Sequence, residues 1–116
     1  MILAADIGGT KALFAFYKRE NSLWQRVYLR KYASKKFNSL EDLIRTFLSD
    51  YTSEYNVGPC IDAACFALAA TITDEGLYMS NLGWRSGIAG LKQAFPEIST
   101  IQLCNDLEAT GYGLEL

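Results

Sequence analysis

A short polar turn near the start of the chain carries residue types that could bind a phosphate. It contains Asp6, Gly8, Gly9, Thr10 and Lys11 and lies between two apolar stretches. Two adjacent glycines have no Cβ atoms, so the backbone N–H groups of such a turn can approach an anion closely. The Asp6 carboxylate would lie where a Mg²⁺ ion bridging phosphates is held. The alternative is a plain β-hairpin whose glycines satisfy positive φ angles.

The absence of some residue types narrows the chemistry further. The chain has no histidine, which excludes Ser-His-Asp and Cys-His mechanisms and His-ligated zinc within it. Its three cysteines, Cys60, Cys65 and Cys104, lack Cys-x-x-Cys spacing and lie in or beside apolar segments. We expect buried free thiols in a reducing cytoplasm. Chemistry must therefore rest on carboxylates, amides, hydroxyls or lysine.

Length and charge set the class of protein. With 116 residues, half of them hydrophobic, the chain can form one domain with one core. The net charge is −2 and the lysines and arginines form no continuous basic patch, so we expect no nucleic-acid partner. No run approaches eighteen apolar residues and no basic segment precedes the first strand, so we expect neither a membrane span nor a signal peptide.

The elements that position the turn begin with three strands. Strands are expected at Ile2–Ile7, Ala12–Arg19 and Leu23–Ala33, joined by short turns and therefore antiparallel, with the third toward the sheet edge. A helix follows, because Ser39 and Asp42 form a capping pattern before apolar residues at helical spacing. We expect this helix to end at Gly58-Pro59.

The second half of the chain alternates strands and helices. In order, we expect a buried strand at Ile61–Ala70, a turn at Thr71–Gly76, a short strand at Leu77–Ser80, a helix at Ser86–Phe95 stopped by Pro96, a strand at Ile101–Cys104 and a helix at Leu107–Leu114. Because crossovers between parallel strands are right-handed, the strands at 61–70 and 101–104 should lie parallel to the first. Ligands gather at the carboxyl ends of such strands, where Asp6, Ala70-Thr71 and Asn105-Asp106 should meet.

Four motifs in this order resemble the N-terminal lobe of bacterial glucokinases, in the sugar kinase, actin and Hsp70 ATPase superfamily. They are Asp6–Lys11, Cys65–Ala70, Met79–Trp84 and Leu103–Ala109, and together they cover essentially the whole chain. The resemblance implies an α/β, ribonuclease H-like mixed five-stranded sheet (β-β-β-α-β-α-β-α) with flanking helices. It also implies that residues 1–116 are the N-terminal lobe of a two-lobed kinase whose C-terminal lobe is missing from the chain.

The resemblance further implies roles for individual residues. Gly8, Gly9, Thr10 and Lys11 would bind the phosphates of ATP, and Asp6 would help to place Mg²⁺. Asn81, Asn105 and Asp106 would bind the sugar, and Asp106 would be the catalytic base. A carboxamide offers both the donor and the acceptor that vicinal hydroxyls require, and a carboxylate at the start of a helix stays ionised.

Structural alternatives remain for several of these residues. Asp106 could be a helix N-cap and Asn105 a turn residue, Asn81 could lie in a β-turn, and Lys11 could be a solvated turn lysine. Trp84 is expected to pack in the core rather than to contact sugar.

The resemblance implies a cytoplasmic glucokinase that transfers the γ-phosphoryl group of ATP to the 6-hydroxyl of glucose. Ala69-Ala70-Thr71 departs from the Ala-Gly-Pro usual in the family. A kinase for another hexose or an N-acetylated sugar, or a non-catalytic sugar-sensing lobe, is therefore an open alternative. The fragment alone should be inactive. Glucose and ATP are the expected partners, nucleic acid and membranes are not, and a homodimer is left open.

Overall fold

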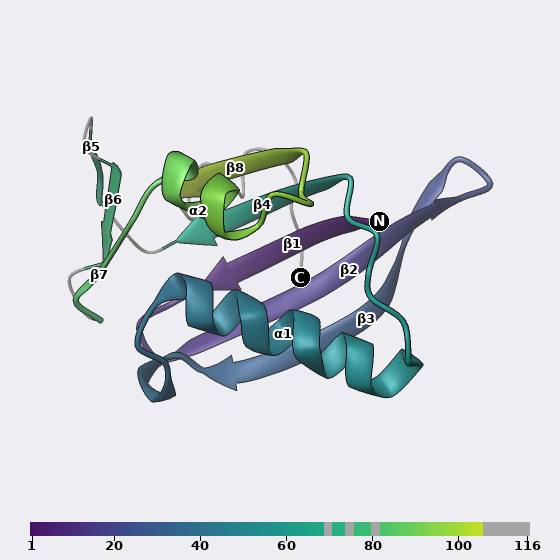
Figure 1. The fold of residues 1–116 in the computed structure, drawn as a ribbon, viewed down its shortest axis with the longest axis horizontal. Helices are drawn as coiled ribbons and strands as arrows, with labels where there is room; N and C mark the ends of the chain where they lie inside the picture. The colour runs from purple at the N-terminus through teal and green to yellow at the C-terminus, as the bar shows by residue number, and fades with distance from the viewer. Residues whose placement is uncertain (69–70, 74–75, 80–81, 106–116) are drawn as a thin grey trace.

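The structure, a computed structural model, describes residues 1–68, 71–73, 76–79 and 82–105. Within these residues, a five-stranded sheet carries two helices, and a small three-stranded sheet lies beside it (Figure 1). The elements are β1 (Ile2–Ile7), β2 (Lys11–Glu20), β3 (Leu23–Ala33), the 3-10 turn η1 (Ser34–Lys36), α1 (Leu40–Tyr55), β4 (Ala63–Leu68), β5 (Thr71–Thr73), β6 (Gly76–Met79), β7 (Trp84–Ser86), α2 (Ile88–Ala94) and β8 (Thr100–Asn105).

The large sheet has the mixed topology expected from the order of elements. Its strand order is β3-β2-β1-β4-β8, with β3 at one edge. The first three strands pair antiparallel, whereas β1 with β4 and β4 with β8 pair parallel. The predicted ribonuclease H-like mixed sheet is therefore confirmed. The helix predicted at Leu107–Leu114 lies outside the described residues.

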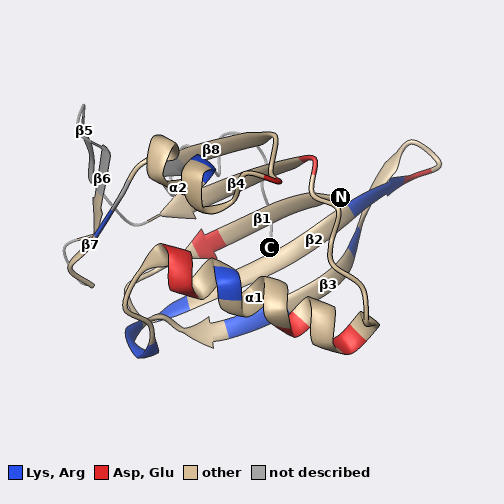
Figure 2. Ribbon diagram, viewed as in Figure 1, with Lys and Arg blue, Asp and Glu red and all other residues tan. Residues whose placement is uncertain are grey.

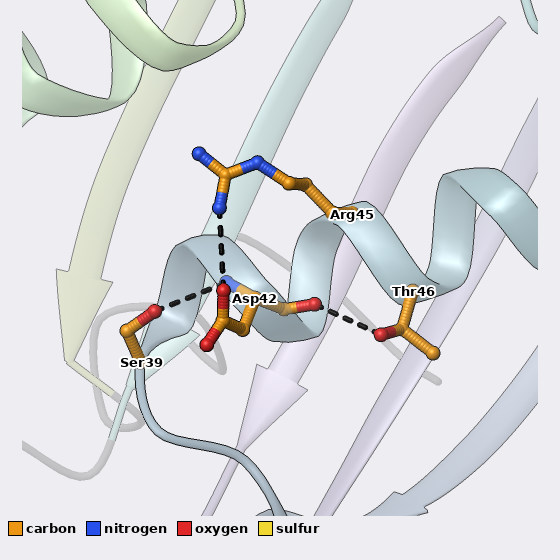
Figure 3. A network of polar contacts seen from close by, with 4 residues as sticks. All are labelled: Ser39, Asp42, Arg45 and Thr46. Carbon is orange, nitrogen blue, oxygen red and sulfur yellow. Dashed lines mark hydrogen bonds and ion pairs between the residues drawn. The ribbon is translucent and has the colours of Figure 1, made fainter.

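The start of α1 is fixed by the predicted cap. Ser39 Oγ accepts a hydrogen bond from the Asp42 backbone N–H at 3.1 Å (Figure 3). The Arg45 guanidinium reaches the Asp42 carboxylate at 3.3 Å, and the Thr46 hydroxyl donates to the Asp42 carbonyl at 3.0 Å. The first turn of the helix is thus tied down by side chains, as its polar N-terminal groups require.

The predicted end of α1 at Gly58-Pro59 is wrong. The helix ends at Tyr55, because Asn56 adopts the left-handed conformation (φ 57°) and donates its N–H to the Thr52 carbonyl at 2.8 Å. Asparagine is one of the few residues that tolerates this conformation and closes a helix with it.

Other differences concern short segments. Thr71–Thr73 is a strand rather than part of a turn, and β7 at Trp84–Ser86 was not expected, because three-residue strands are too short to show a period. The helix expected from Ser86 begins at Ile88. Cys60 is exposed rather than buried, although it is free as expected.

The main core lies on the side of the sheet that both helices cover (Figure 1). Phe14 and Phe16 of β2 pack against Phe47 of α1, with ring centroids 5.2 and 4.9 Å apart. Each fully buried side chain of this size contributes about 1.5–3 kcal/mol. Trp84 is also in this core, as expected. Neither helix among the described residues is long and apolar enough to cross a membrane.

Strand β3 is attached to α1 by polar contacts along the edge of the sheet. The Tyr32 hydroxyl donates to the Asp50 carboxylate at 2.6 Å, and Arg30 pairs with Glu54 at 3.0 Å. Burial, and then the bond to Asp50, raises the pKa of Tyr32 well above its usual value. The end of β3 therefore has a fixed place relative to the helix.

The pairing of β3 with β2 contains one irregularity. Phe16 lies opposite Tyr28, but Tyr17 lies opposite Arg26, so Val27 is an extra residue in β3. Such a β-bulge bends the strand and increases its twist.

Candidate functional site

The carboxyl ends of the three parallel strands form one row. Ile7 of β1 is in register with Leu68 of β4, which is in register with Asn105 of β8. Because neighbouring strands lie about 4.8 Å apart, Ile7 and Asn105 are about 10 Å apart across this edge. The turn that follows β1 and Asn105 at the end of β8 therefore lie at one edge, as the topology predicted (Figure 1).

Asp6 lies at this edge with an exposed side chain. Its backbone pairs with Leu13 on one side and Ala67 on the other. Because side chains alternate along a strand and both Ala5 and Ile7 belong to the main core, Asp6 points to the sheet face opposite the helices. On that face its neighbours are the small buried residues Ala4 and Ala67.

The Gly8–Lys11 hairpin turn joins β1 to β2. The Gly8 N–H donates to the Lys11 carbonyl at 2.9 Å, and a Cβ added at Gly8 would come within 3.3 Å of that oxygen. Neither Gly8 nor Gly9 has a positive φ, so the alternative that these glycines serve a left-handed backbone is wrong. Thr10 and Lys11 are exposed. The turn thus presents a bare backbone followed by a hydroxyl and an ammonium group.

Ser34, which is not among the predicted site residues, forms a hydrogen bond with this turn. The Ser34 N–H donates to the Thr10 carbonyl at 3.0 Å, and Ala33 is in register with Lys11. Ser34 itself is completely buried, whereas Lys35 and Lys36 after it are exposed. The adjacent lysines after the third strand were the available signal, but the bond to Thr10 joins residues far apart in the sequence.

Several predicted site residues are not described in full. Asn81, Asp106 and the Ala69-Ala70 part of the departure lie outside the described residues, and of Asn105 only the backbone is described. Residues before and after Asn81 in the sequence, Met79 and Trp84, are buried in the main core.

The segment between Met79 and Trp84 contains a tight turn. The Gly83 N–H donates to the Met79 carbonyl at 2.8 Å, with Gly83 at a left-handed φ of 68°.

Metal binding at this edge would rest on few protein ligands. Among the described residues, no group of three or more acidic, cysteine or histidine side chains could hold a metal ion. Mg²⁺ commonly binds through one or two carboxylates, with phosphate oxygens and water completing its shell. A single carboxylate beside a turn that could bind phosphate fits that pattern, and Asp6 lies beside the Gly8–Lys11 turn.

Comparison with known proteins agrees with this architecture. Residues 3–116 match the family model described as Glucokinase. A glucokinase from Nostoc sp. (strain PCC 7120) is 32% identical over 115 residues, covering 98% of this chain and 32% of the relative. A glucokinase from Synechocystis sp. is 32% identical over 117 residues, covering 97% of this chain and 33% of the relative.

A solved structure shows the same fold. The crystal structure of a glucokinase from an Antarctic psychrotroph superposes with a TM-score of 0.81 at 32% identity, covering 96% of this chain and 34% of that one. The chain thus spans about a third of the length of the curated and solved relatives it matches.

Proposed function

The chain belongs to the glucokinase family, and we propose that the whole protein transfers the γ-phosphoryl group of ATP to the 6-hydroxyl of glucose. We assign residues 1–116 to the N-terminal lobe of that two-lobed kinase, with the second lobe supplied by further chain. The observation that supports the proposal is the row Ile7, Leu68 and Asn105, which brings the Gly8–Lys11 turn and Asn105 to one edge of the sheet.

On the nucleotide side, the proposed contacts come from the hairpin turn. Backbone N–H groups of Gly9 and Thr10 would approach phosphate oxygens, because glycine places no Cβ in the way. The exposed Lys11 would add positive charge, and Asp6 would hold Mg²⁺ directly or through water. Bound Mg²⁺·ATP supplies the transferable phosphoryl group and neutralises its developing charge.

On the sugar side, the proposed residues come after β6 in the chain and at and after the end of β8. Asn81 and Asn105 would hydrogen-bond sugar hydroxyls, and Asp106 would accept the proton of the attacking hydroxyl. A weak base is sufficient, since phosphoryl transfer has a loose transition state and depends mainly on positioning and charge neutralisation. Because the second lobe must complete the site, the fragment alone should be inactive.

The test uses the full-length protein and glucose-dependent ADP release. Asp106→Asn should nearly abolish turnover while leaving glucose binding largely intact, because the amide cannot accept the proton. Asp62→Asn is the matched control, since Asp62 is exposed and precedes β4 at the opposite end of the sheet. Full turnover by Asp106→Asn would overturn the mechanism.

A panel of sugars separates the remaining alternatives. Glucose should be preferred over mannose, fructose and N-acetylglucosamine. Preference for one of these would reassign the substrate, and sugar binding without any ADP release would favour a sensing lobe. A cytoplasmic location, a homodimer and the absence of nucleic-acid and membrane partners stay predictions.

A further inference from the structure

The turn η1 places two lysines beside the hairpin that follows β1. The Ser34 N–H donates to the Thr10 carbonyl at 3.0 Å, so the backbone of η1 lies directly against the hairpin. Lys35 and Lys36 come next in the chain, and Lys11 opens β2. Figure 2 shows the basic segments at η1 and at the start of β2 side by side, near the end of β1.

These lysines form a local excess of positive charge. Lys11, Lys35 and Lys36 are all exposed. The ion pairs between described residues join Met1 to Asp62, Arg30 to Glu54 and Arg45 to Asp42, so none of them involves the three lysines. Like charges held close together repel each other, and an anion bound among them relieves that repulsion.

We propose that η1 is a second part of the nucleotide phosphate site. Ser34 positions the hairpin through its backbone N–H, and Lys35 and Lys36 provide positive charge to the phosphates that the hairpin binds. This inference rests on the proposed function, because it takes the Gly8–Lys11 hairpin as the phosphate-binding turn. A lysine side chain carries its ammonium group on a flexible four-carbon stem, so Lys35 and Lys36 can approach an anion held on the turn that Ser34 contacts.

The burial of Ser34 favours this role over that of a solvated turn. Its complete burial and its bond to Thr10 fix the backbone from which both lysines extend. The lysines therefore keep their charge near the hairpin even though their side chains are flexible. Exposed charges that act in this way strengthen anion binding most at low ionic strength, because salt screens them.

The test measures binding of Mg²⁺·ATP to the full-length protein by isothermal titration calorimetry at low and high salt. The double variant Lys35→Gln, Lys36→Gln should bind at least fivefold more weakly at low salt, and its affinity should depend less on salt. The double variant Lys18→Gln, Arg19→Gln is the control, because it removes the same two positive charges from exposed residues. Lys18 lies seven residues along β2 from Lys11, about 23 Å away, and the control should leave the affinity unchanged.

Affinity of the double variant within twofold of the wild type, with an unchanged salt dependence, would overturn the inference. The two lysines are exposed, so the thermal unfolding midpoint should stay the same in all variants. If the full-length protein phosphorylates glucose but the lysine substitutions leave the Mg²⁺·ATP affinity unchanged, this inference alone is refuted. Lysine-dependent binding without glucose-dependent turnover would refute only the proposed function.

Discussion

Two hairpin turns connect the first three strands, and they differ in where glycine and positive φ angles occur. In the turn between β2 and β3, Asn21 and Ser22 have φ angles of 53° and 67°. In the turn between β1 and β2, Gly8 and Gly9 have no positive φ. Glycine is therefore absent where the left-handed conformation occurs and present where it does not.

The difference indicates what the first turn is for. A non-glycine residue in the left-handed conformation costs roughly 1–2 kcal/mol, somewhat less for asparagine. The second turn accepts that cost. At Gly8 the hairpin itself limits size, because a Cβ would crowd the Lys11 carbonyl at 3.3 Å. For Gly9, a positive φ is not the reason for glycine, and the proposed close approach of a phosphate would supply one.

The largest expected effect comes from giving the first turn a side chain. Gly9→Ala should weaken Mg²⁺·ATP binding by about tenfold or more, equivalent to about 1.4 kcal/mol, because the methyl group holds the phosphates away. Titration calorimetry on the full-length protein measures this. The thermal midpoint should change little, since Gly9 is not among the residues with a positive φ. Unaltered affinity would remove the functional reason for this glycine.

A smaller effect is expected where β3 is held next to the first turn. Tyr32→Phe removes the hydroxyl bound to Asp50 at 2.6 Å and should lower the free energy of unfolding by about 1 kcal/mol near pH 8. The pKa of Tyr32 is raised in the folded state, so its stabilising contribution is complete below about pH 10 and declines at higher pH. Urea unfolding of both proteins at pH 8 and pH 10.5 tests this.

The expected difference between the two proteins shrinks at the higher pH. A difference that grew with pH would contradict the assignment of the shift to Tyr32.

The second turn should respond to glycine in the opposite sense. Ser22→Gly should stabilise the protein by about 0.5–1 kcal/mol, because it relieves a left-handed serine. Mg²⁺·ATP affinity should stay the same. Differential scanning calorimetry measures the stability change, and a lowered midpoint would show that the Ser22 side chain makes a stabilising contact of its own.

The smallest effect is expected at the contact between η1 and the first turn. The Ser34 hydroxyl is buried and has no hydrogen-bond partner in the described structure. Ser34→Ala keeps the backbone N–H that binds Thr10, so stability and Mg²⁺·ATP affinity should both change by less than about 0.5 kcal/mol. A marked loss of affinity would mean that the hydroxyl, rather than the backbone, positions the hairpin.

Local sequence patterns predicted the elements that have strong local signals. The bounds of β1 and β3 agree with those expected from the short turns that separate the first three strands, and the start of α1 follows from the Ser39 cap. The end of α1 was missed because Asn56 closed the helix before the more obvious Gly58-Pro59.

The site was predictable only to the extent that topology determines it. Right-handed crossovers were enough to bring Asp6 and Asn105 to one edge of the sheet. The bond from Ser34 to Thr10 was not predictable, because it depends on the register between β2 and β3 rather than on any local pattern.

The bulge at Val27 also bears on how the edge of the sheet could pair with another strand. An edge strand offers unpaired backbone groups to any other extended chain, and β3 is long and carries exposed apolar side chains at Leu23 and Trp24. The extra residue breaks the regular ladder that an incoming strand would need to match, and Arg26 beside it adds charge. We therefore expect this irregular edge to pair less readily with another strand, which disfavours aggregation and fibril growth.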